Sequence, residues 1–180
     1  MGSLASTLRW TGLALAIVLF ASSCATTRPS IGAGALPAQG PVAVSWRDPA
    51  TFSEPTWGAL VIDRGTWVRP LAEHVRWRAE HLLPAGHRLE VELLDVDRAG
   101  EYEPGRAGST GHIRIIRDIY PPRVWLRFRH LDGAGAVLAE GERRLVDAGF
   151  VLRSPVSDTD PLRYEKRLLD NWLRRELGRR

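Results

Sequence analysis

The stretch RLEVELLDVD, Arg88–Asp97, decides the fold, because apolar and charged residues alternate along it as they do along a half-buried β-strand. From Leu89 to Leu93 every second residue is apolar, and glutamates lie between. The adjacent pair Leu93-Leu94 shifts this alternation by one position, so that Leu94 and Val96 continue the apolar row. Such a shift predicts a β-bulge inside the strand.

Other segments show a similar alternation and are predicted to be strands. They are residues 42–47, 112–117, Arg123–Leu131 and Val137–Val146. Residues 150–152 are predicted to add a short edge. Because these strands alternate instead of being apolar throughout, we expect a mostly antiparallel sheet with one covered face.

Two segments follow the helical period instead. Between residues 67 and 83 apolar residues recur at helical spacing, Pro70 falls within the first turn, and Pro84 to Gly86 end the pattern. A second helix is predicted from Pro161 to about Leu177, with Asp160 at the N-cap. Its apolar stripe consists of Tyr164, Leu168, Leu169, Trp172 and Leu173.

The order of these segments, β-α-β-β-β-α, predicts a single α+β domain over residues 42–180. We expect a mostly antiparallel sheet of about five strands with both helices on one face. A domain of this length buries enough surface to fold without disulfides or a metal. No cysteine follows Cys24, which excludes disulfides, thiol nucleophiles and thiolate zinc sites from the domain.

Cys24 follows a short apolar run over residues 10–20 and two small residues. This context is typical of a bacterial lipoprotein signal, so residues 1–23 are predicted to be a signal peptide and Cys24 to carry the lipid. The run is too short for a transmembrane helix, which needs roughly 18 apolar residues or more. Because Ala21 stands where leucine is usual, ordinary cleavage to a soluble periplasmic protein remains the alternative.

Residues 24–41 are rich in glycine, alanine and proline, so they are predicted to form a flexible linker that includes the lipidated cysteine. The whole chain carries a formal net charge of +4. That charge is too small for a nucleic-acid interface, and no glycine-rich phosphate loop follows a predicted strand. We therefore expect no nucleic acid, no nucleotide and no cofactor.

Carboxylates gather at the end of the central strand and just after it, at Asp95, Asp97, Glu101 and Glu103. Because residues two apart on a strand share a face, such a cluster could bind a hard cation such as calcium and serve a metal-dependent hydrolase. The alternative is a solvated strand end whose charge is balanced by Arg98 and Arg106. We favour the solvated strand end.

His74 and His81 lie on the first predicted helix. The zinc-protease pattern of two histidines flanking a glutamate is absent. We expect both histidines to be solvent-exposed and neither to bind a metal. No catalytic set of residues emerges elsewhere in the chain.

Basic and aromatic residues alternate along Arg123–Leu131, and two tyrosines lie in nearby loops. These residue types are over-represented at the energetic centres of interfaces. The candidate binding surface consists of Tyr102, Tyr120, Arg123, Trp125, Arg127 and Arg129. Such a ribbon could bind an anionic glycolipid or peptidoglycan. We favour the alternative, a ladder of cross-strand ion pairs that cancels the positive charge; its carboxylates would come from Glu90, Glu92, Glu140 and Glu142.

Four segments carry a resemblance to a known family: SWRDPATF, LPAGHRLEVELLDVDRAGEYEP, RIIRDIYPPRVWLRF and LRYEKRLLDNWLRREL. They resemble the proteobacterial domain-of-unknown-function family 3016 over nearly the whole domain. The corner RDIYPPR and the helix motif YEKRLLDxW are the most specific parts. The resemblance implies a secreted or envelope protein of a Gram-negative bacterium without an assigned activity, and no catalytic residue can be carried over from it.

These features predict a non-enzymatic binding or accessory module that faces the periplasm and is held to the lipid bilayer by its acyl chains. Ala25, directly after the cysteine, resembles the pattern that sorts bacterial lipoproteins to the outer membrane. We expect an unidentified envelope protein as partner. The alternatives are anionic glycolipid or peptidoglycan binding by the basic strand, and the metal-dependent hydrolase.

Overall fold

The computed structural model describes residues 32–54, 65–102, 114–153 and 157–178. These residues form one sheet of five strands in the order β1-β2-β3-β4-β5. The strands are β1 (Gly34–Ala35), β2 (Val42–Trp46), β3 (Arg88–Asp97), β4 (Arg123–Leu131) and β5 (Val137–Val146). The helices are α1 (Val68–Glu80), α2 (Arg163–Leu177) and the short 3-10 helix η1 (Pro49–Thr51).

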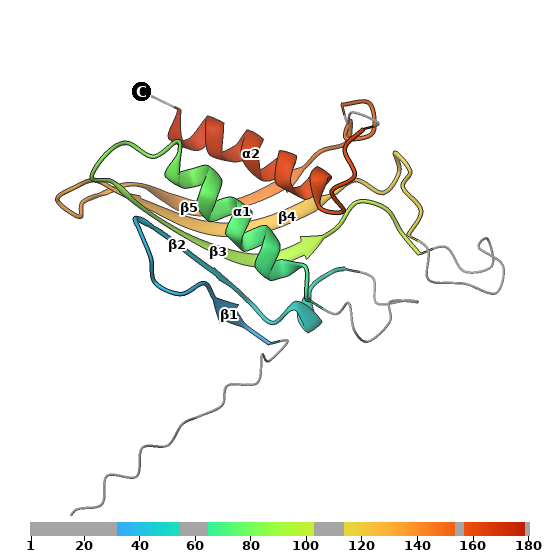
Figure 1. The fold of residues 1–180 in the computed structure, drawn as a ribbon, viewed down its shortest axis with the longest axis horizontal. Helices are drawn as coiled ribbons and strands as arrows, with labels where there is room; N and C mark the ends of the chain where they lie inside the picture. The colour runs from blue at the N-terminus through green and yellow to red at the C-terminus, as the bar shows by residue number, and fades with distance from the viewer. Residues whose placement is uncertain (1–31, 55–64, 103–113, 154–156, 179–180) are drawn as a thin grey trace, which may run out of the picture.

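The sheet is mostly antiparallel, which confirms the predicted α+β fold. Among the described strands only β2 and β3 pair in parallel, because α1 lies between them in the chain and returns it to the same end of the sheet. Both helices cover one face of the sheet (Figure 1). The core lies between the two layers, and we call the uncovered side of the sheet the open face.

The core joins the apolar rows of the strands to both helices. Phe128 on β4 packs edge-to-face against Trp172 on α2, with ring centroids 5.7 Å apart. The apolar stripe predicted for the second helix is buried as expected. From α1 the core receives Val68, Leu71, Ala72, Val75 and Ala79.

β3 has the predicted bounds and the predicted bulge, between Leu93 and Asp95. Leu93 and Val96 are both buried, and Leu94 is the extra residue between them. Without this extra residue, Asp95 would face the helices as Leu93 does. The bulge instead places Asp95 on the open face, opposite Trp125 of β4.

The helix ends differ slightly from the predicted ones. α1 ends at Glu80, earlier than expected, and α2 begins at Arg163, after Pro161. Asp160 is therefore not the N-cap residue. It still stabilises the start of α2, because its carboxylate accepts a hydrogen bond from the backbone N–H of Leu162 at 2.8 Å.

Two predicted strands are wrong in the described residues. Of the segment 112–117, residues 114–117 are described, and they form a single bridge, between Ile115 and Glu101. The side chain of Arg114 folds back onto the loop after β3, which holds this segment beside that loop instead of along a strand. Residues 150–152 form a turn instead of an edge strand.

Part of the predicted linker, residues 24–41, is folded. Gly34 and Ala35 form β1 and pair antiparallel with β2, and Leu36 is buried in the core. These three residues of the predicted linker therefore belong to the folded domain. Local composition could not reveal this, because a strand of two residues has no alternation to detect.

None of the helices within the described ranges is long and apolar enough to span a membrane. The predicted signal peptide, residues 1–23, and Cys24 lie outside the described residues. The described chain starts at residue 32, and β1 follows at the edge of the sheet beside β2. Any tether that precedes it therefore joins the domain at this edge.

Candidate functional site

The open face carries Arg127 in the middle of β4, between Glu92 on β3 and Glu142 on β5. The guanidinium of Arg127 lies 2.9 Å from the carboxylate of Glu92 and 2.8 Å from that of Glu142. The hydrogen bond to Glu142 raises the pKa of Arg127, and the same bond lowers the pKa of Glu142. The two directions agree, so both groups are charged at neutral pH.

Arg129 repeats this arrangement further along β4. Its guanidinium lies 3.4 Å from Glu90 on β3 and 3.3 Å from Glu140 on β5. The structure thus confirms the predicted ladder of cross-strand ion pairs. Exposed pairs of this kind add little stability singly. Together they hold long side chains in a defined array, which we call the charge lattice; it comprises Glu90, Glu92, Arg127, Arg129, Glu140 and Glu142.

Trp125 stands at one end of the charge lattice. Its indole N–H donates a hydrogen bond to Glu142 at 3.0 Å. The guanidinium of Arg144 lies over the Trp125 ring, 4.7 Å from the centroid. Both the indole N–H and one ring face of Trp125 make contacts within the domain. This half-buried side chain is therefore held in one orientation.

A groove of about 480 Å³ lies beside the lattice, between β2, β3 and β4 and the segment that joins β1 to β2. Ala43 and Ser45 of β2 line it, and the register places them opposite Glu90 and Glu92. Arg127 and Arg129 complete the far wall. A concavity of this volume fits a side chain or a short peptide segment.

The predicted candidate surface is divided between two regions. Arg123, Trp125, Arg127 and Arg129 all belong to β4, and Arg123 donates to Asp97 on β3 at 2.9 Å. Burial raises the pKa of Asp97, and the hydrogen bond from Arg123 opposes that shift. Tyr102 and Tyr120 belong instead to the loops at the end of β3.

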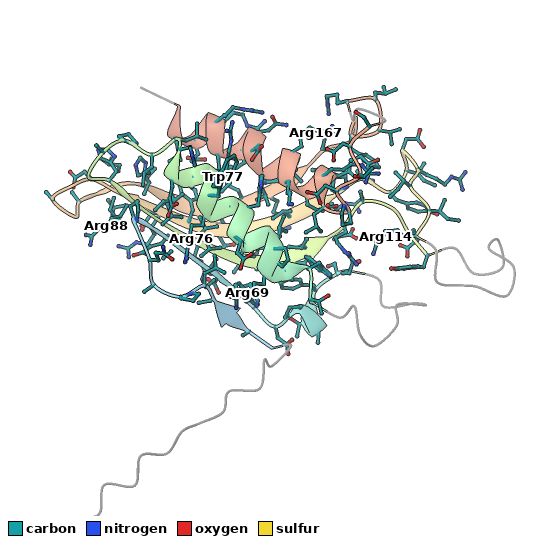
Figure 2. The ribbon with its side chains drawn as sticks, viewed as in Figure 1. Arg69, Arg76, Trp77, Arg88, Arg114 and Arg167 are labelled. Atoms are coloured by element: carbon teal, nitrogen blue, oxygen red, sulfur yellow. The ribbon has the colours of Figure 1, made fainter. Side chains whose placement is uncertain are left out.

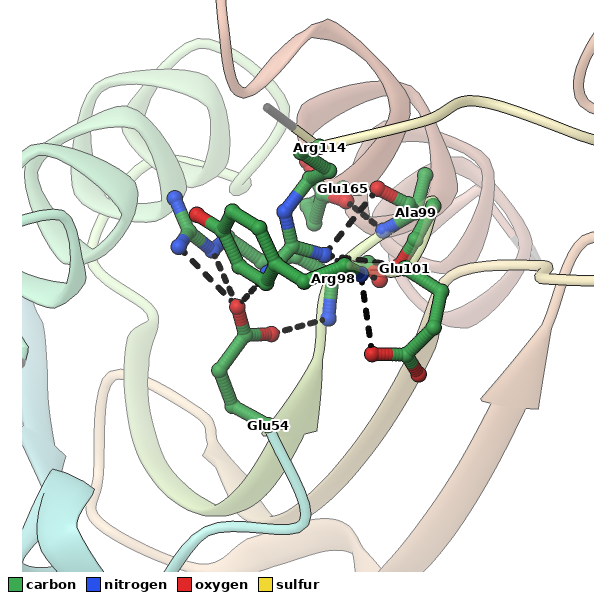
Figure 3. A network of polar contacts seen from close by, with 8 residues as sticks. Glu54, Arg98, Ala99, Glu101, Arg114 and Glu165 are labelled. Carbon is green, nitrogen blue, oxygen red and sulfur yellow. Dashed lines mark hydrogen bonds and ion pairs between the residues drawn. The ribbon is translucent and has the colours of Figure 1, made fainter. Parts of the chain in front are cut away.

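These loops hold a second polar site, shown in Figure 3, which we call the loop-end network; it comprises Glu54, Arg98, Arg114 and Glu165. The carboxylate of Glu54 accepts hydrogen bonds from Arg114 and from Arg98, whose Nε lies 3.0 Å away. Arg114 also donates to three successive backbone carbonyls, at residues 98, 99 and 100. The ring of Tyr102 lies under its guanidinium, 4.8 Å away.

The loop passes close to Arg114 because Gly100 has a φ of +86°, and a Cβ there would lie 2.6 Å from the side chain of Ile116. The backbone N–H of Gly100 donates to the carbonyl of Tyr120 at 3.0 Å. The corner around Tyr120 is thereby attached to the loop after β3. The network is a structural joint between segments far apart in the sequence.

Glu165 is the buried member of this network, with 1% of its surface exposed. Its Oε1 accepts a hydrogen bond from the backbone N–H of Ala99 at 2.7 Å. Its Oε2 is buried without a hydrogen-bond partner among the described residues. Burial raises the pKa of Glu165, and the hydrogen bond from Ala99 opposes that shift.

The carboxylates proposed for a hydrolase have separate partners. Asp95 accepts hydrogen bonds from the N–H and the hydroxyl of Ser53, at 2.6 and 2.7 Å. Asp97 pairs with Arg123, and Glu101 accepts from the N–H of Tyr102. Glu103 lies outside the described residues. Within the described ranges no three histidine, cysteine or acidic residues are grouped closely enough to bind a metal ion.

The prediction that both helix histidines face solvent is wrong for His74. Its Nε2 lies 2.8 Å from the carboxylate of Asp170 on α2, and its side chain is 18% exposed. Packing of α2 beside α1 places the two groups together, which helical spacing alone does not reveal. His81 is exposed as predicted, and its Nδ1 lies 2.6 Å from the carbonyl of Trp77.

The sequence did not predict a contact between two further histidines, His87 and His130. Nδ1 of His87 lies 3.0 Å from Nε2 of His130, so one ring donates a hydrogen bond to the other. Burial and the neighbouring His87 lower the pKa of His130, and Glu176 opposes that shift. No local pattern links His87, before β3, to His130 near the end of β4.

The sequence did not predict the loop-end network either. Glu54, Arg98 and Arg114 come from three separate segments of the chain, so no spacing relates them. One feature of the sequence could have indicated the role of Glu165: it is a charged residue beside Tyr164 in an otherwise apolar helix stripe. A buried position for such a residue requires a partner from elsewhere.

Comparison with known proteins adds one match. A family model described as "Protein of unknown function (DUF3016)" matches residues 40–175. The match confirms the resemblance expected from the sequence motifs. Neither the curated proteins nor the solved structures contain a match to this chain.

Proposed function

This chain belongs to the DUF3016 family, a family of unknown function, and we propose that it is a non-enzymatic binding module of the bacterial cell envelope that uses its open face. The partner is an envelope protein with a surface of mixed charge. The domain faces the periplasm and is held at the membrane by acyl chains on Cys24.

This proposal rests on the observation that the side chains of the open face are held in place by contacts with one another. Arg127 and Arg129 are each held between two carboxylates, and Trp125 is held by Glu142 and Arg144. Binding costs less when the contacting side chains are already ordered. Tryptophan and arginine are also the residues that contribute most at interfaces.

The charge pattern favours a protein partner over a polyanion. The arginines of the lattice lie within 3.4 Å of carboxylates, and these negative groups offset the positive electrostatic potential of the arginines. A glycolipid phosphate would have to displace those carboxylates to reach an arginine. A protein surface with alternating charges can match the lattice without breaking it, and the groove beside it accommodates a projecting side chain.

A binding role also fits the acidic residues better than a hydrolase does. Asp95, Asp97 and Glu101 each bond to a different neighbour. A general acid and base need to act on one shared point. These three carboxylates provide no such point.

The envelope location rests on the sequence around Cys24, with its short apolar run and small residues. Mass spectrometry of the mature N-terminus tests it. The expected result is a chain that begins at Cys24 and carries acyl mass. A chain that still begins at Met1 and has an unmodified thiol would contradict the proposal.

Site-specific photocrosslinking in intact cells tests the binding role. A photoreactive residue at Ala43, exposed in the groove, is expected to give one discrete protein adduct. The matched control is the same residue at Glu73, which is exposed on α1 in the opposite layer. Equal adducts at both positions, or none at Ala43, would contradict a partner at the open face.

A further inference from the structure

Charge is distributed unequally between the two layers of the domain. Strands β3, β4 and β5 contain six arginines and six acidic residues. Helices α1 and α2 contain eight lysine or arginine residues and five acidic ones. One of those five, Glu165, is buried. The excess positive charge of the folded elements therefore lies in the helical layer.

Trp77 is a large aromatic side chain exposed in this layer, with 54% of its surface accessible. It belongs to α1, as Figure 2 shows. Its ring lies 4.7 Å from the ring of His81, centroid to centroid, and 6.1 Å from that of His74. The tryptophan is thus supported by its neighbours while much of the indole remains exposed to solvent.

Both helices carry an arginine one turn beyond the contact that joins them. The contact of His74 with Asp170 aligns α1 with α2. Arg78 is one turn beyond His74, and Arg174 is one turn beyond Asp170, so the two arginines lie at the same level. Arg78 also approaches Asp170, at 3.7 Å.

Arg174 and Arg175 are the exposed cations at this end of α2. Arg174 donates to the side-chain amide oxygen of Asn171 at 2.5 Å. In the part of the chain that the structure describes, no carboxylate lies within ion-pair distance of either arginine. We call the surface formed by Trp77, Arg78, His81, Arg174 and Arg175 the helical patch.

We propose that the helical patch lies against the anionic headgroups of the membrane that holds the anchor, an inference that rests on the proposed envelope location. Clustered arginines are attracted to an anionic lipid surface. A tryptophan beside them buries its ring at headgroup depth. The open face, on the other side of the sheet, then points away from the bilayer toward the partner.

Helix stability alone does not explain the patch. Cations in the last turn of a helix interact favourably with the helix dipole, which accounts for Arg174 and Arg175. The same effect gives no reason for an exposed tryptophan in the same helical layer. An exposed indole contributes most to binding when a partner surface buries its apolar ring.

Fluorescence quenching in vesicles tests the inference on the full chain. The chain is reconstituted into neutral phosphatidylcholine vesicles and into vesicles that also contain phosphatidylglycerol, with the same content of brominated lipid. The signal of Trp77 is the difference between the parent chain and Trp77→Phe. We expect about threefold stronger quenching of Trp77 in the anionic vesicles, lost in high salt.

Paired variants locate the effect. Arg174→Gln with Arg175→Gln is expected to reduce the quenching of Trp77 in anionic vesicles to the level in neutral ones. The matched control, Arg129→Gln with Arg144→Gln on the open face, is expected to leave it unchanged. Equal quenching in both vesicle types would overturn the inference, as would an equal response to both pairs. If Trp77→Phe fails to fold, the total tryptophan quenching of the parent chain is compared instead with that of the two arginine pairs, at low and at high salt.

Flotation separates this inference from the proposed anchor. A chain that floats with neutral vesicles but shows no selective quenching of Trp77 retains its anchor and overturns the helical patch. A chain that binds only anionic vesicles, with Trp77 quenched, supports the patch and contradicts the anchor. A chain that floats with neither overturns both.

Discussion

The backbone N–H of Ala99 donates a hydrogen bond to Oε1 of Glu165 at 2.7 Å, so a carboxylate of the last helix closes the end of the central strand. In consequence α2 is attached to the loop after β3 by a polar contact inside the core.

Glu165→Gln is expected to remove part of the pH dependence of stability. The pKa of Glu165 is raised in the folded chain, so the folded state holds this proton more tightly than the unfolded state. Its contribution is therefore full at low pH and is lost as the pH rises through the folded pKa. Urea unfolding from pH 4 to pH 8 is expected to show a smaller alkaline loss in the variant.

The exposed Glu80→Gln on α1 is the matched control for Glu165→Gln. Its unfolding free energy is expected to follow the parent chain at every pH. Parallel curves for the parent chain and Glu165→Gln would mean that the buried carboxyl does not titrate differently in the folded state.

His130→Gln is expected to act in the opposite pH direction. The pKa of His130 is lowered in the folded chain by burial and by His87, so the unfolded state binds this proton more tightly. The stability that depends on neutral His130 is present above the unfolded pKa and is lost as the pH falls through the folded one. Acid destabilisation is expected to shrink in His130→Gln and to persist in the exposed control His81→Gln.

Glu54→Gln is expected to destabilise the domain by about 3 kcal/mol, because it leaves Arg98 and Arg114 without their shared carboxylate in a largely buried site. Glu140→Gln, in the exposed lattice, is expected to cost less than about 1 kcal/mol. Chemical denaturation measures both. Equal losses would show that the loop-end network is as solvated as the open face.

Trp125→Ala combined with Arg127→Ala is expected to weaken partner binding at least about tenfold, since both residues are of the types that dominate interfaces. The variant is expected to keep a melting temperature near that of the parent chain, because both side chains are on the open face and outside the core. Copurification from crosslinked cells measures binding. A large fall in melting temperature would assign both residues to the scaffold.

Cys24→Ser is expected to abolish acylation, because a hydroxyl cannot form the thioether that holds the lipid. Mass spectrometry of the N-terminus and membrane fractionation measure the result. The variant chain is expected to lack acyl mass and to leave the membrane fraction. Unchanged fractionation of the variant would contradict anchoring through Cys24.

Local patterns predicted much of this fold correctly. The alternation in β3 and its shift at Leu93 revealed both the strand and the bulge, because each depends only on neighbours in the chain. The apolar stripe at helical spacing likewise revealed α2 and its buried side. Over residues 114–117 the predicted strand is wrong, because contacts of Arg114 with the loop after β3 outweigh a short alternation.

The candidate site was only partly predictable. Alternating arginines on β4 and glutamates on β3 and β5 indicated a ladder, yet only the register decides that Arg127 lies between Glu92 and Glu142. A slip of one residue in that register would turn every side chain of a strand to the other face. Pairing partners are therefore a property of the assembled sheet.

By itself, the sequence determined the elements whose cause is periodic: an alternating central strand with its bulge, two amphipathic helices, and the single cysteine in a lipoprotein-like context. Only the tertiary structure decided that His87 contacts His130 and that Glu54 joins Arg98 to Arg114. The physical reason is that periodicity records which side of an element is buried. The partner of a buried polar group depends on how distant segments pack.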